Sequence, residues 1–345
     1  MRITGIPGNT VAFRGRTYFD EKADAVFFNW TCAGFDLMFQ GSKIEAEFVS
    51  SYCSDKFAAY LLVLIDSGTD NEYKHKIKLD KQRAFYTLAE NLTYGFHSIK
   101  VIKITECQYA TAGVTQINCD GELIELSRKK RKLMVEFIGD SITCGFGNIS
   151  HNADDEFSTS YEDGFQSFAA LTANNLDADF NCISLSGWAV YKSPYGRTLP
   201  DIYSKTDALN DPALAEWNFK EKQADIVVLG LGTNDSAWTG SDPVKLGEFE
   251  NAYVNFLYDI RGRYPGAYIV CVLGSLVIPE HPIFERVRNA VQRLSDNKSE
   301  FLKITYVDRE TEGLGCGHPT IIKHQKIAKT LLNRLNTLIY SIEQQ

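Results

Sequence analysis

The sequence predicts an α/β protein built from two domains, a jelly-roll β-sandwich over residues 1–127 and a doubly wound parallel sheet over residues 133–345. Residues up to about 125 lack helical periodicity and break into short alternating or aromatic runs separated by turn residues, as in sandwiches of antiparallel sheets. From Leu133 onward, short apolar runs alternate with longer helical patterns, as in parallel strands joined by helices. The 345 residues are enough for two domains.

The sandwich domain is expected to consist of short strands, because turn signals such as Q-G-S at residues 40–42 recur between its apolar runs. The expected strands are Val11–Phe13, Ala25–Trp30, Phe35–Phe39, Ile44–Val49, Ala59–Ile65, Tyr73–Leu79, Arg83–Leu88, His97–Ile104 and Gly113–Ile117. The basic run R-K-K-R-K at Arg128–Lys132 follows. Such a run can be a localisation signal, but we interpret it as a solvated interdomain linker.

The second domain is expected to contain a five-stranded parallel sheet with helices between its strands. The expected strands are Leu133–Ile138, Asp179–Leu185, Asp225–Leu231, Tyr268–Leu273 and Lys303–Val307. The expected helices are Tyr161–Leu176, Leu246–Arg263, Phe284–Asn297 and Thr320–Ile342.

Composition excludes several classes of function. The 36 basic and 44 acidic residues give a net charge of −8, which argues against nucleic acid and anionic membrane surfaces as partners. No apolar run is long enough to span a bilayer, and no secretory signal is visible. The eight cysteines include no C-x-x-C motif, so we expect reduced thiols. A cytoplasmic location is the default, and secretion is the alternative if a signal has been removed.

One stretch, V-E-F-I-G-D-S-I-T-C-G-F-G at Val135–Gly147, combines a buried strand with a glycine-rich loop. Ligands bind at the carboxyl end of such strands, so the loop serine, Ser141, is a candidate nucleophile. Taken alone, the stretch fits an ordinary strand and turn equally well. Three later motifs favour catalysis: Gly187 in C-I-S-L-S-G-W, Asn234 in V-V-L-G-L-G-T-N-D and His318 in C-G-H-P.

These residue types supply the parts of a serine esterase. A serine hydroxyl needs a base at neutral pH, and His318 is the candidate, with His281 and His324 as rivals. Gly187, Asn234 and the backbone N–H of Ser141 are candidate oxyanion donors, each worth on the order of 3 kcal/mol. The alternatives are turn or capping roles for Ser141, Gly187 and Asn234, and an ordinary surface histidine before proline for His318.

Two neighbouring aspartates are expected to be structural. Asp140 and Asp235 lie beside the proposed serine and asparagine, and we expect them to brace their loops through backbone hydrogen bonds. No cluster of His, Asp and Glu with metal-ligand spacing is visible, and acyl transfer by a serine needs no Lewis acid, so no metal or cofactor is expected.

The order serine, glycine, asparagine, histidine resembles the four sequence blocks of the SGNH (GDSL-type) hydrolases. With the preceding sandwich, L-P-D-I-Y at residues 199–203 and G-H-P…H-Q-K-I-A at residues 317–328, the chain resembles carbohydrate esterase family 2. The stretch F-N-W-T-C-A-G-F-D-L-M-F-Q-G-S and the K-I-T-E segment at residues 103–106 are similar to that family's sandwich domain. The resemblance implies removal of O-acetyl groups from plant polysaccharide or oligosaccharide, of the xylan or mannan type, without a metal.

The chain departs from the SGNH pattern at one position. Many SGNH enzymes carry an aspartate three residues before the histidine, whereas this sequence has Gly315 there. Either a backbone carbonyl orients His318, or a more distant acid substitutes, or the enzyme is impaired. The acids nearest in sequence are Asp308, Glu310 and Glu312.

Aromatic residues suggest the substrate. Trp188, Tyr191, Tyr195 and Trp238 follow the strands that carry Gly187 and Asn234. We expect Trp238, which has small polar neighbours, and Trp188 to contact sugar, although packing roles are the alternative. Two other functions remain open: a lipid or thioester hydrolase of the same superfamily, and a catalytically weak carbohydrate-binding protein.

Overall fold

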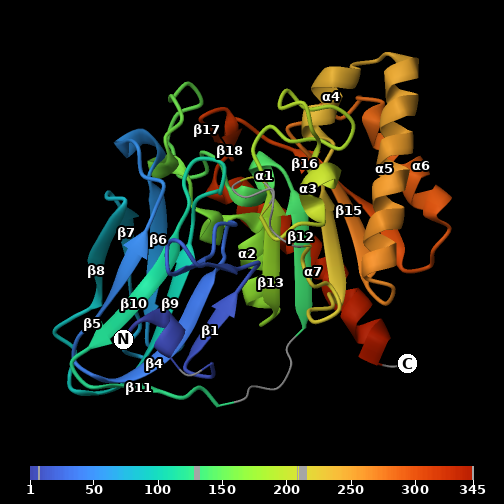
Figure 1. The fold of residues 1–345 in the computed structure, drawn as a ribbon. Helices are drawn as coiled ribbons and strands as arrows, with labels where there is room; N and C mark the ends of the chain where they lie inside the picture. Colours follow the sequence, from blue (N-terminus) through green and yellow to red (C-terminus); the bar gives the residue numbers. More distant parts are fainter. Residues whose placement is uncertain (7, 128–132, 208, 210–215, 344–345) are drawn as a thin grey trace. The chain divides into compact units, whose positions relative to one another are not determined.

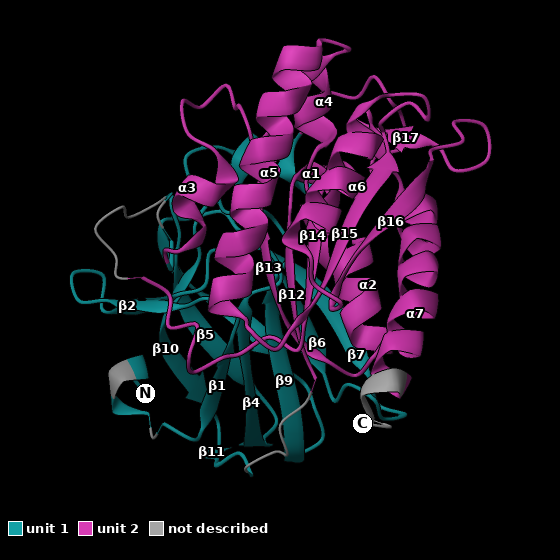
Figure 2. Ribbon diagram, turned by 90° about the vertical axis from the view of Figure 1, so that its right-hand side faces the viewer, with its two compact units in different colours: residues 1–131, 158–160, 206–214 teal, residues 132–157, 161–205, 215–345 magenta. Residues whose placement is uncertain are grey.

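The computed structural model describes residues 1–345 except 7, 128–132, 208, 210–215 and 344–345 (Figure 1). The chain divides into two compact units (Figure 2). Unit 1 comprises Met1–Arg131, Ser158–Ser160 and Thr206–Leu214, and unit 2 comprises Lys132–Phe157, Tyr161–Lys205 and Ala215–Gln345. The basic run interpreted as a linker lies outside the described residues.

Two short segments beyond the expected boundary belong to unit 1 rather than to the second domain. The indole Nε1 of Trp30 donates a hydrogen bond to the carbonyl of Thr206 at 2.7 Å, and Asn29 Nδ2 donates to Asp207 Oδ2 at 2.6 Å. Ser158 Oγ donates to the carbonyl of Lys56 at 3.0 Å. These contacts join residues more than 100 positions apart, so a boundary drawn from local patterns could not include them.

Unit 1 consists of two antiparallel sheets, which confirms the predicted sandwich. Its strands are β1 (Val11–Arg14), β2 (Tyr18–Asp20), β3 (Ala25–Phe27), β4 (Gly34–Gly41), β5 (Ile44–Val49), β6 (Ala59–Ile65), β7 (Tyr73–Leu79), β8 (Arg83–Ala89), β9 (Gly95–Lys103), β10 (Gly113–Cys119) and β11 (Glu122–Ile124), with 3₁₀ turns at Ile3–Gly5 and Asp55–Phe57. One sheet has the order β1-β4-β9-β6-β7 with β11 paired to β4, and the other has the order β2-β3-β10-β5-β8. Phe35 of β4 and Phe48 of β5 pack with their ring centroids 6.4 Å apart, which ties the two sheets through one core.

Unit 2 is built on the predicted five-stranded parallel sheet. Its strands are β12 (Met134–Gly139), β13 (Asp179–Ser184), β14 (Ile226–Gly230), β15 (Tyr268–Ser275) and β16 (Ser299–Tyr306), in the order β13-β12-β14-β15-β16, with a small hairpin of β17 (Leu314–Gly315) and β18 (His318–Pro319). Gly139 pairs in register with both Ser184 and Gly230. Three neighbouring strands therefore end at one level, and their loops leave from the same edge of the sheet.

The helices of unit 2 are α1 (Ser141–Cys144), α2 (Phe168–Asn175), α3 (Leu199–Tyr203), α4 (Thr233–Thr239), α5 (Pro243–Arg263), α6 (Ile283–Leu294) and α7 (Ile321–Glu343), with 3₁₀ turns at Thr159–Tyr161 and Gly164–Gln166. The expected helix from Tyr161 begins only at Phe168. Asp163 and Ser167 each accept a hydrogen bond from a backbone N–H two or three residues later, so they cap separate segments and interrupt a single helix.

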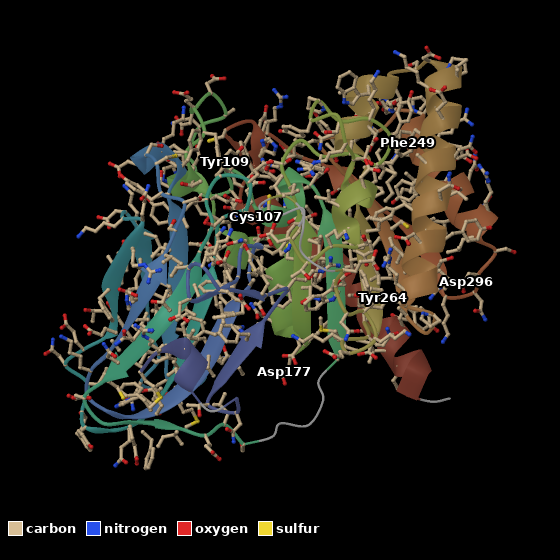
Figure 3. All side chains as sticks on the ribbon, in the orientation of Figure 1. Cys107, Tyr109, Asp177, Phe249, Tyr264 and Asp296 are labelled. Carbon is tan, nitrogen blue, oxygen red and sulfur yellow. The ribbon has the colours of Figure 1, made fainter. Side chains whose placement is uncertain are left out.

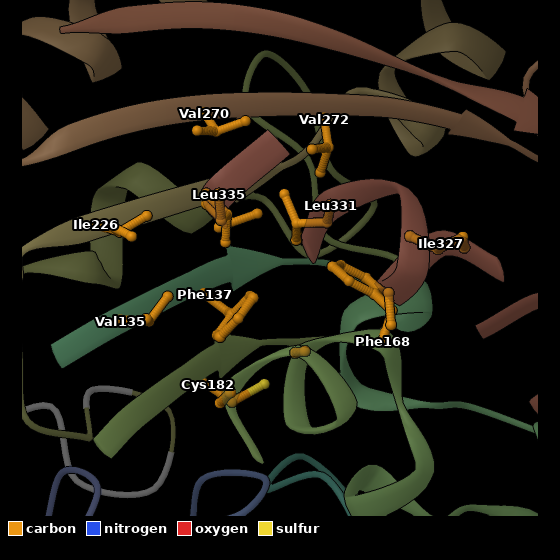
Figure 4. Close-up of a cluster of buried hydrophobic side chains, with 14 of the residues drawn as sticks. Val135, Phe137, Phe168, Cys182, Ile226, Val270, Val272, Ile327, Leu331 and Leu335 are labelled. Carbon is orange, nitrogen blue, oxygen red and sulfur yellow. The ribbon is translucent and has the colours of Figure 1, made fainter. Parts of the chain in front are cut away.

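The core of unit 2 lies between the sheet and helices α2 and α7 (Figure 4). Phe137 of β12, Phe168 of α2 and Leu331 of α7 are all at most 3% exposed in this cluster. Burial of each such side chain contributes about 1.5–3 kcal/mol. The strand that precedes the nucleophile loop is therefore anchored on a packed face.

Strand β12 also carries a buried carboxyl group, Glu136. Its oxygens accept hydrogen bonds from Tyr203 Oη (2.5 Å), Asn181 Nδ2 (3.0 Å) and Tyr264 Oη (3.0 Å), the last of which is labelled in Figure 3. A buried polar group is tolerated when hydrogen-bond partners surround it in this way. Among the described residues, no helix has the length and apolar character to cross a membrane, and all eight cysteines are free thiols.

Candidate active site

Ser141 is the first residue of the short helix α1, directly after strand β12. Asp140 is the N-cap, and its Oδ1 accepts a hydrogen bond from the N–H of Ile142 at 3.0 Å. Gly145, at φ 86°, and Phe146 both donate their N–H groups to the carbonyl of Ser141. At the first helical position the N–H of Ser141 has no intrahelical acceptor, so the loop holds this residue with a donor available beside its hydroxyl.

The structure brings Ser141 and His318 together across 177 positions of sequence. His318 Nε2 lies 2.9 Å from Ser141 Oγ, and His318 Nδ1 lies 3.0 Å from the carbonyl oxygen of Cys316. A carbonyl only accepts hydrogen bonds, so Nδ1 carries the proton and Nε2 has a free lone pair. That tautomer is the one that can take a proton from the serine hydroxyl.

The environment of His318 also favours the neutral ring. Burial lowers the pKa of His318 below its usual value, and the hydrogen bond to the Cys316 carbonyl acts in the opposite direction. The imidazole is therefore unprotonated, and so able to act as a base, at neutral pH.

Asp308 and Glu312, two of the three acids nearest in sequence, have partners other than the imidazole. Asp308 accepts hydrogen bonds from Glu310 and Thr311 in its own turn. Glu312 is buried against Lys323 and Lys326 at 3.2 and 2.8 Å. The Cys316 carbonyl, the first of the three alternatives raised by the sequence, occupies the place of the triad acid.

The proposed oxyanion donors, Asn234 and Gly187, lie on neighbouring loops joined by a hydrogen bond. Asn234 is in the first turn of α4, and its Nδ2 donates to the carbonyl of Trp188 at 2.8 Å. One amide proton is thereby used to orient the side chain, and the other remains as a donor. Gly187 adopts φ 81°, and a Cβ added there would lie 2.9 Å from the hydroxyl of Tyr195. Cys144 Sγ of α1 is 3.6 Å from Ser186 Oγ, so the Gly187 loop adjoins the nucleophile helix.

Asp140 and Asp235 brace these loops through backbone hydrogen bonds, as expected. Asp235 is fully buried and accepts the N–H groups of Val190 and Tyr191 at 3.1 and 2.8 Å. Burial raises the pKa of Asp140 to about 7 and that of Asp235 to about 6, partly offset by the backbone donors. Asp235 thus fixes the segment that carries the Trp188 carbonyl, and through that carbonyl it fixes Asn234.

The two proposed sugar-contacting tryptophans differ in position. Trp238 on α4 is 38% exposed, with the Lys192 ammonium 5.4 Å from its ring centroid. Trp188 is only 1% exposed and is stacked beneath Tyr195, with ring centroids 5.4 Å apart. The expectation that Trp188 contacts sugar is therefore wrong for this conformation, because Tyr195, 51% exposed, covers its ring.

The rival histidines are engaged elsewhere. His324 is buried on α7, and its Nδ1 accepts the N–H of Phe168 at 3.1 Å. Burial lowers the pKa of His324 to about 3. His281 Nδ1 accepts the N–H of Ile283 at the start of α6.

Sequence reasoning missed the aromatic residues that pack against His318. Phe146 lies against His318 with ring centroids 4.5 Å apart, and Phe157 stacks on Phe146 at 3.6 Å. Phe146 stands within the nucleophile motif, but nothing in its local sequence indicates a distant histidine as its neighbour.

A cavity of about 30 Å³ lies behind α1, lined by Ile142, Thr143, Thr233 and Ser275 among others. A water needs about 10–15 Å³ of such volume, so the cavity has room for about two waters. It cannot take a long acyl chain.

Comparisons with known proteins agree with this geometry. The model of the GDSL-like Lipase/Acylhydrolase family matches residues 137–320, and the model of the carbohydrate esterase 2 N-terminal domain matches residues 13–126. The solved structure of a family two carbohydrate esterase from Clostridium thermocellum, in complex with cellohexaose, is similar with a TM-score of 0.84 and 26% identity over 95% of this chain and 99% of that one.

Two curated relatives extend the comparison. The chain is 25% identical over 334 residues to an acetylxylan esterase / glucomannan deacetylase of Cellvibrio japonicus, covering 94% of this chain and 88% of the relative. It is 27% identical over 304 residues to the cellulase/esterase CelE of Acetivibrio thermocellus, covering 84% of this chain. The match spans only 36% of that longer relative.

Proposed function

Because the chain belongs to the GDSL-like lipase/acylhydrolases and, with its N-terminal domain, to carbohydrate esterase family 2, we propose that it removes O-acetyl groups from plant polysaccharide or oligosaccharide of the xylan or mannan type. The observation that carries the chemistry is His318, with Nε2 2.9 Å from Ser141 Oγ and Nδ1 on a carbonyl. The names of the relatives support the substrate class.

The residues act in two half-reactions. Ser141 Oγ attacks the acetyl carbonyl carbon while His318 Nε2 takes its proton, and the resulting oxyanion is stabilised by Asn234 Nδ2–H with the N–H groups of Ser141 and Gly187. His318 then gives the proton to the departing sugar oxygen, which leaves an acetyl ester on Ser141. Water, deprotonated by the same nitrogen, attacks this ester, and His318 Nε2 returns the proton to Ser141 Oγ as the Oγ–acyl bond breaks and acetate leaves. The Cys316 carbonyl stabilises the imidazolium that forms in both halves.

Two observations favour this proposal over the alternatives. The names of the similar proteins point to carbohydrate rather than to lipid or thioester substrates. A binding protein that had lost catalysis would not need the serine, the base and the oriented Asn234 amide to be held together.

The test is acetate release from acetylated glucomannan and acetylated xylan, with ¹H NMR to identify which acetyl signals disappear. We expect turnover by the natural chain and none above background by Ser141→Ala. Hydrolysis of a small aryl acetate without any release of acetate from either polysaccharide or from their oligosaccharides would reject the proposed substrate class.

A further inference from the structure

The carbonyl that orients His318 belongs to a strained turn. Strands β17 and β18 pair with Gly315 opposite His318, which leaves Cys316 and Gly317 as a two-residue connection. Both have positive φ, 49° and 73°, as in a type I′ turn, where Asn-Gly is the preferred pair. A residue with a Cβ is disfavoured in this region of backbone conformation, so Cys316 adds strain to the turn. The turn therefore needs outside contacts to keep the carbonyl on the imidazole.

Those contacts come from a loop that follows the nucleophile motif. The N–H of Cys316 donates to the carbonyl of Asn152 at 2.9 Å. The N–H of Asn152 donates to Ser150 Oγ at 3.3 Å, and Ser150 Oγ donates to Asp155 Oδ2 at 2.6 Å. Asn152 Nδ2 also lies 3.4 Å from Asp155 Oδ1. Asp155 thus closes a loop over residues 150–155. The Asn152 carbonyl of this loop accepts the N–H of Cys316 and so holds the histidine turn.

The same segment of chain supports the imidazole ring itself. Phe146 packs on His318, and Phe157 stacks on Phe146. Residues 146–157 therefore contact the base twice, once through its ring and once through the peptide that accepts its Nδ1 proton.

From these contacts we infer that Asp155 is a positioning residue for His318. It does through Ser150, Asn152 and the Cys316 backbone what the acid of a Ser-His-Asp triad does by direct contact. The hydrogen bond from Ser150 lowers the pKa of Asp155, so the carboxylate stays ionised across the working range. The inference rests on the proposed function only in taking His318 as the base.

The first experiment compares Asp155→Ala with Asp154→Ala in the full chain. Asp154 is the exposed neighbour and takes no part in these hydrogen bonds. With a small aryl acetate, we expect Asp155→Ala to lower kcat about tenfold with KM within about twofold, because the substrate contacts are unchanged, while Asp154→Ala leaves both constants unchanged.

The second readout is the tautomer of His318, followed by NMR with ¹⁵N-labelled histidine and assigned with His318→Gln. We expect the natural chain and Asp154→Ala to show the Nδ1–H form, and Asp155→Ala to show a mixture of the two neutral forms. Unfolding would also release the imidazole to a mixture of the two forms, so a thermal melt must first show that Asp155→Ala is folded. If Asp155→Ala does not fold, Ser150→Ala breaks the same chain of hydrogen bonds one step nearer to Cys316.

The third step is rescue. Adding Cys316→Asn to Asp155→Ala places the preferred Asn-Gly pair in the turn, which should then keep its shape without the supporting loop. We therefore expect much of the lost kcat and of the Nδ1–H form to return. An unchanged tautomer in Asp155→Ala and in Ser150→Ala would overturn the inference. These readouts involve no carbohydrate, so a chain that ignores acetylated polysaccharide but shows the tautomer shift would reject the proposed function and keep the inference.

Discussion

The proposed nucleophile, Ser141, and the proposed base, His318, are held in different ways. Ser141 is fixed by its immediate neighbours: the Asp140 cap and the N–H groups of Gly145 and Phe146. His318 is fixed by a turn that is itself held by residues more than 150 positions away. The difference teaches that a nucleophile loop can be recognised from a short motif, whereas the support of its base is visible only in the folded chain.

The largest expected effect tests whether Ser141 and His318 act as one catalytic unit. Because one proton passes between them, Ser141→Ala, His318→Ala and the double variant should each lower kcat by a similar factor, on the order of 10⁴ to 10⁶. The measurement is the steady-state kcat of all three proteins with an aryl acetate. A double variant far slower than either single variant would show that the residues do not form one catalytic unit.

Substitution of Asn234, a proposed oxyanion donor, should affect catalysis without disturbing the support of His318. Asn234→Ala removes a donor aimed at charge that develops only in the transition state, so kcat should fall by about 10² to 10³ with little change in KM. The effect should be equal for an aryl acetate and an acetylated oligosaccharide, since both form the same oxyanion. Asn234→Asp is the control: it keeps the size but replaces the amide donor with an acceptor, and should be at least as slow.

Substitution of Gly315 should disturb the turn that holds His318 and leave the Ser141 loop in place. The φ of Gly315 is not in the left-handed region, but a Cβ there would lie 2.3 Å from the carbonyl oxygen of Gly147 and 2.7 Å from that of Ser150. Gly315→Asp should therefore push the histidine turn away from its supporting loop, and we expect about a tenfold loss of kcat rather than a gain. Gly247→Asp, where a Cβ meets nothing within 4 Å, controls for the added charge. A folded Gly315→Asp with tenfold higher turnover would show that His318 had been poorly held.

The sequence predicted the parts of the site that depend on local signals. The five strands of unit 2 and the loops after three of them follow from apolar runs that end in glycine and polar residues. The Cys316 carbonyl remained one of three alternatives, because backbone orientation in a turn leaves little trace in residue identity. Trp188 was expected to contact sugar because it follows the strand that carries Gly187, whereas Tyr195, seven residues later, stacks on its ring in the folded chain.

The pKa of His318 should determine how the activity depends on pH, and we expect this effect to be smaller than those of the substitutions above. Burial holds its pKa below 6.5, and the base works only when neutral, so activity should persist as the pH falls to the pKa and decline below it. Asp140 and Asp235 titrate nearby, at about 7 and about 6, so the pKa should be read from an NMR titration of His318 rather than from rates. A value above 6.5 would contradict the expected dominance of burial.

The last and smallest effect concerns a residue that belongs to neither the nucleophile nor the base. Trp238 offers a 38% exposed ring on α4, whose first turn carries Asn234. An aromatic face can stack against a sugar ring, but it touches nothing of the acetyl group, so Trp238→Ala should lower kcat/KM for acetylated oligosaccharide by about three- to tenfold, or up to about 1.4 kcal/mol. The value for a small aryl acetate should stay the same, because Ser141 and His318 keep their positions. Tyr258→Ala, which removes another exposed aromatic ring, on α5, controls for loss of surface and should affect neither substrate. Equal losses on both substrates in Trp238→Ala would show that the ring does not bind sugar but supports helix α4, which carries Asn234.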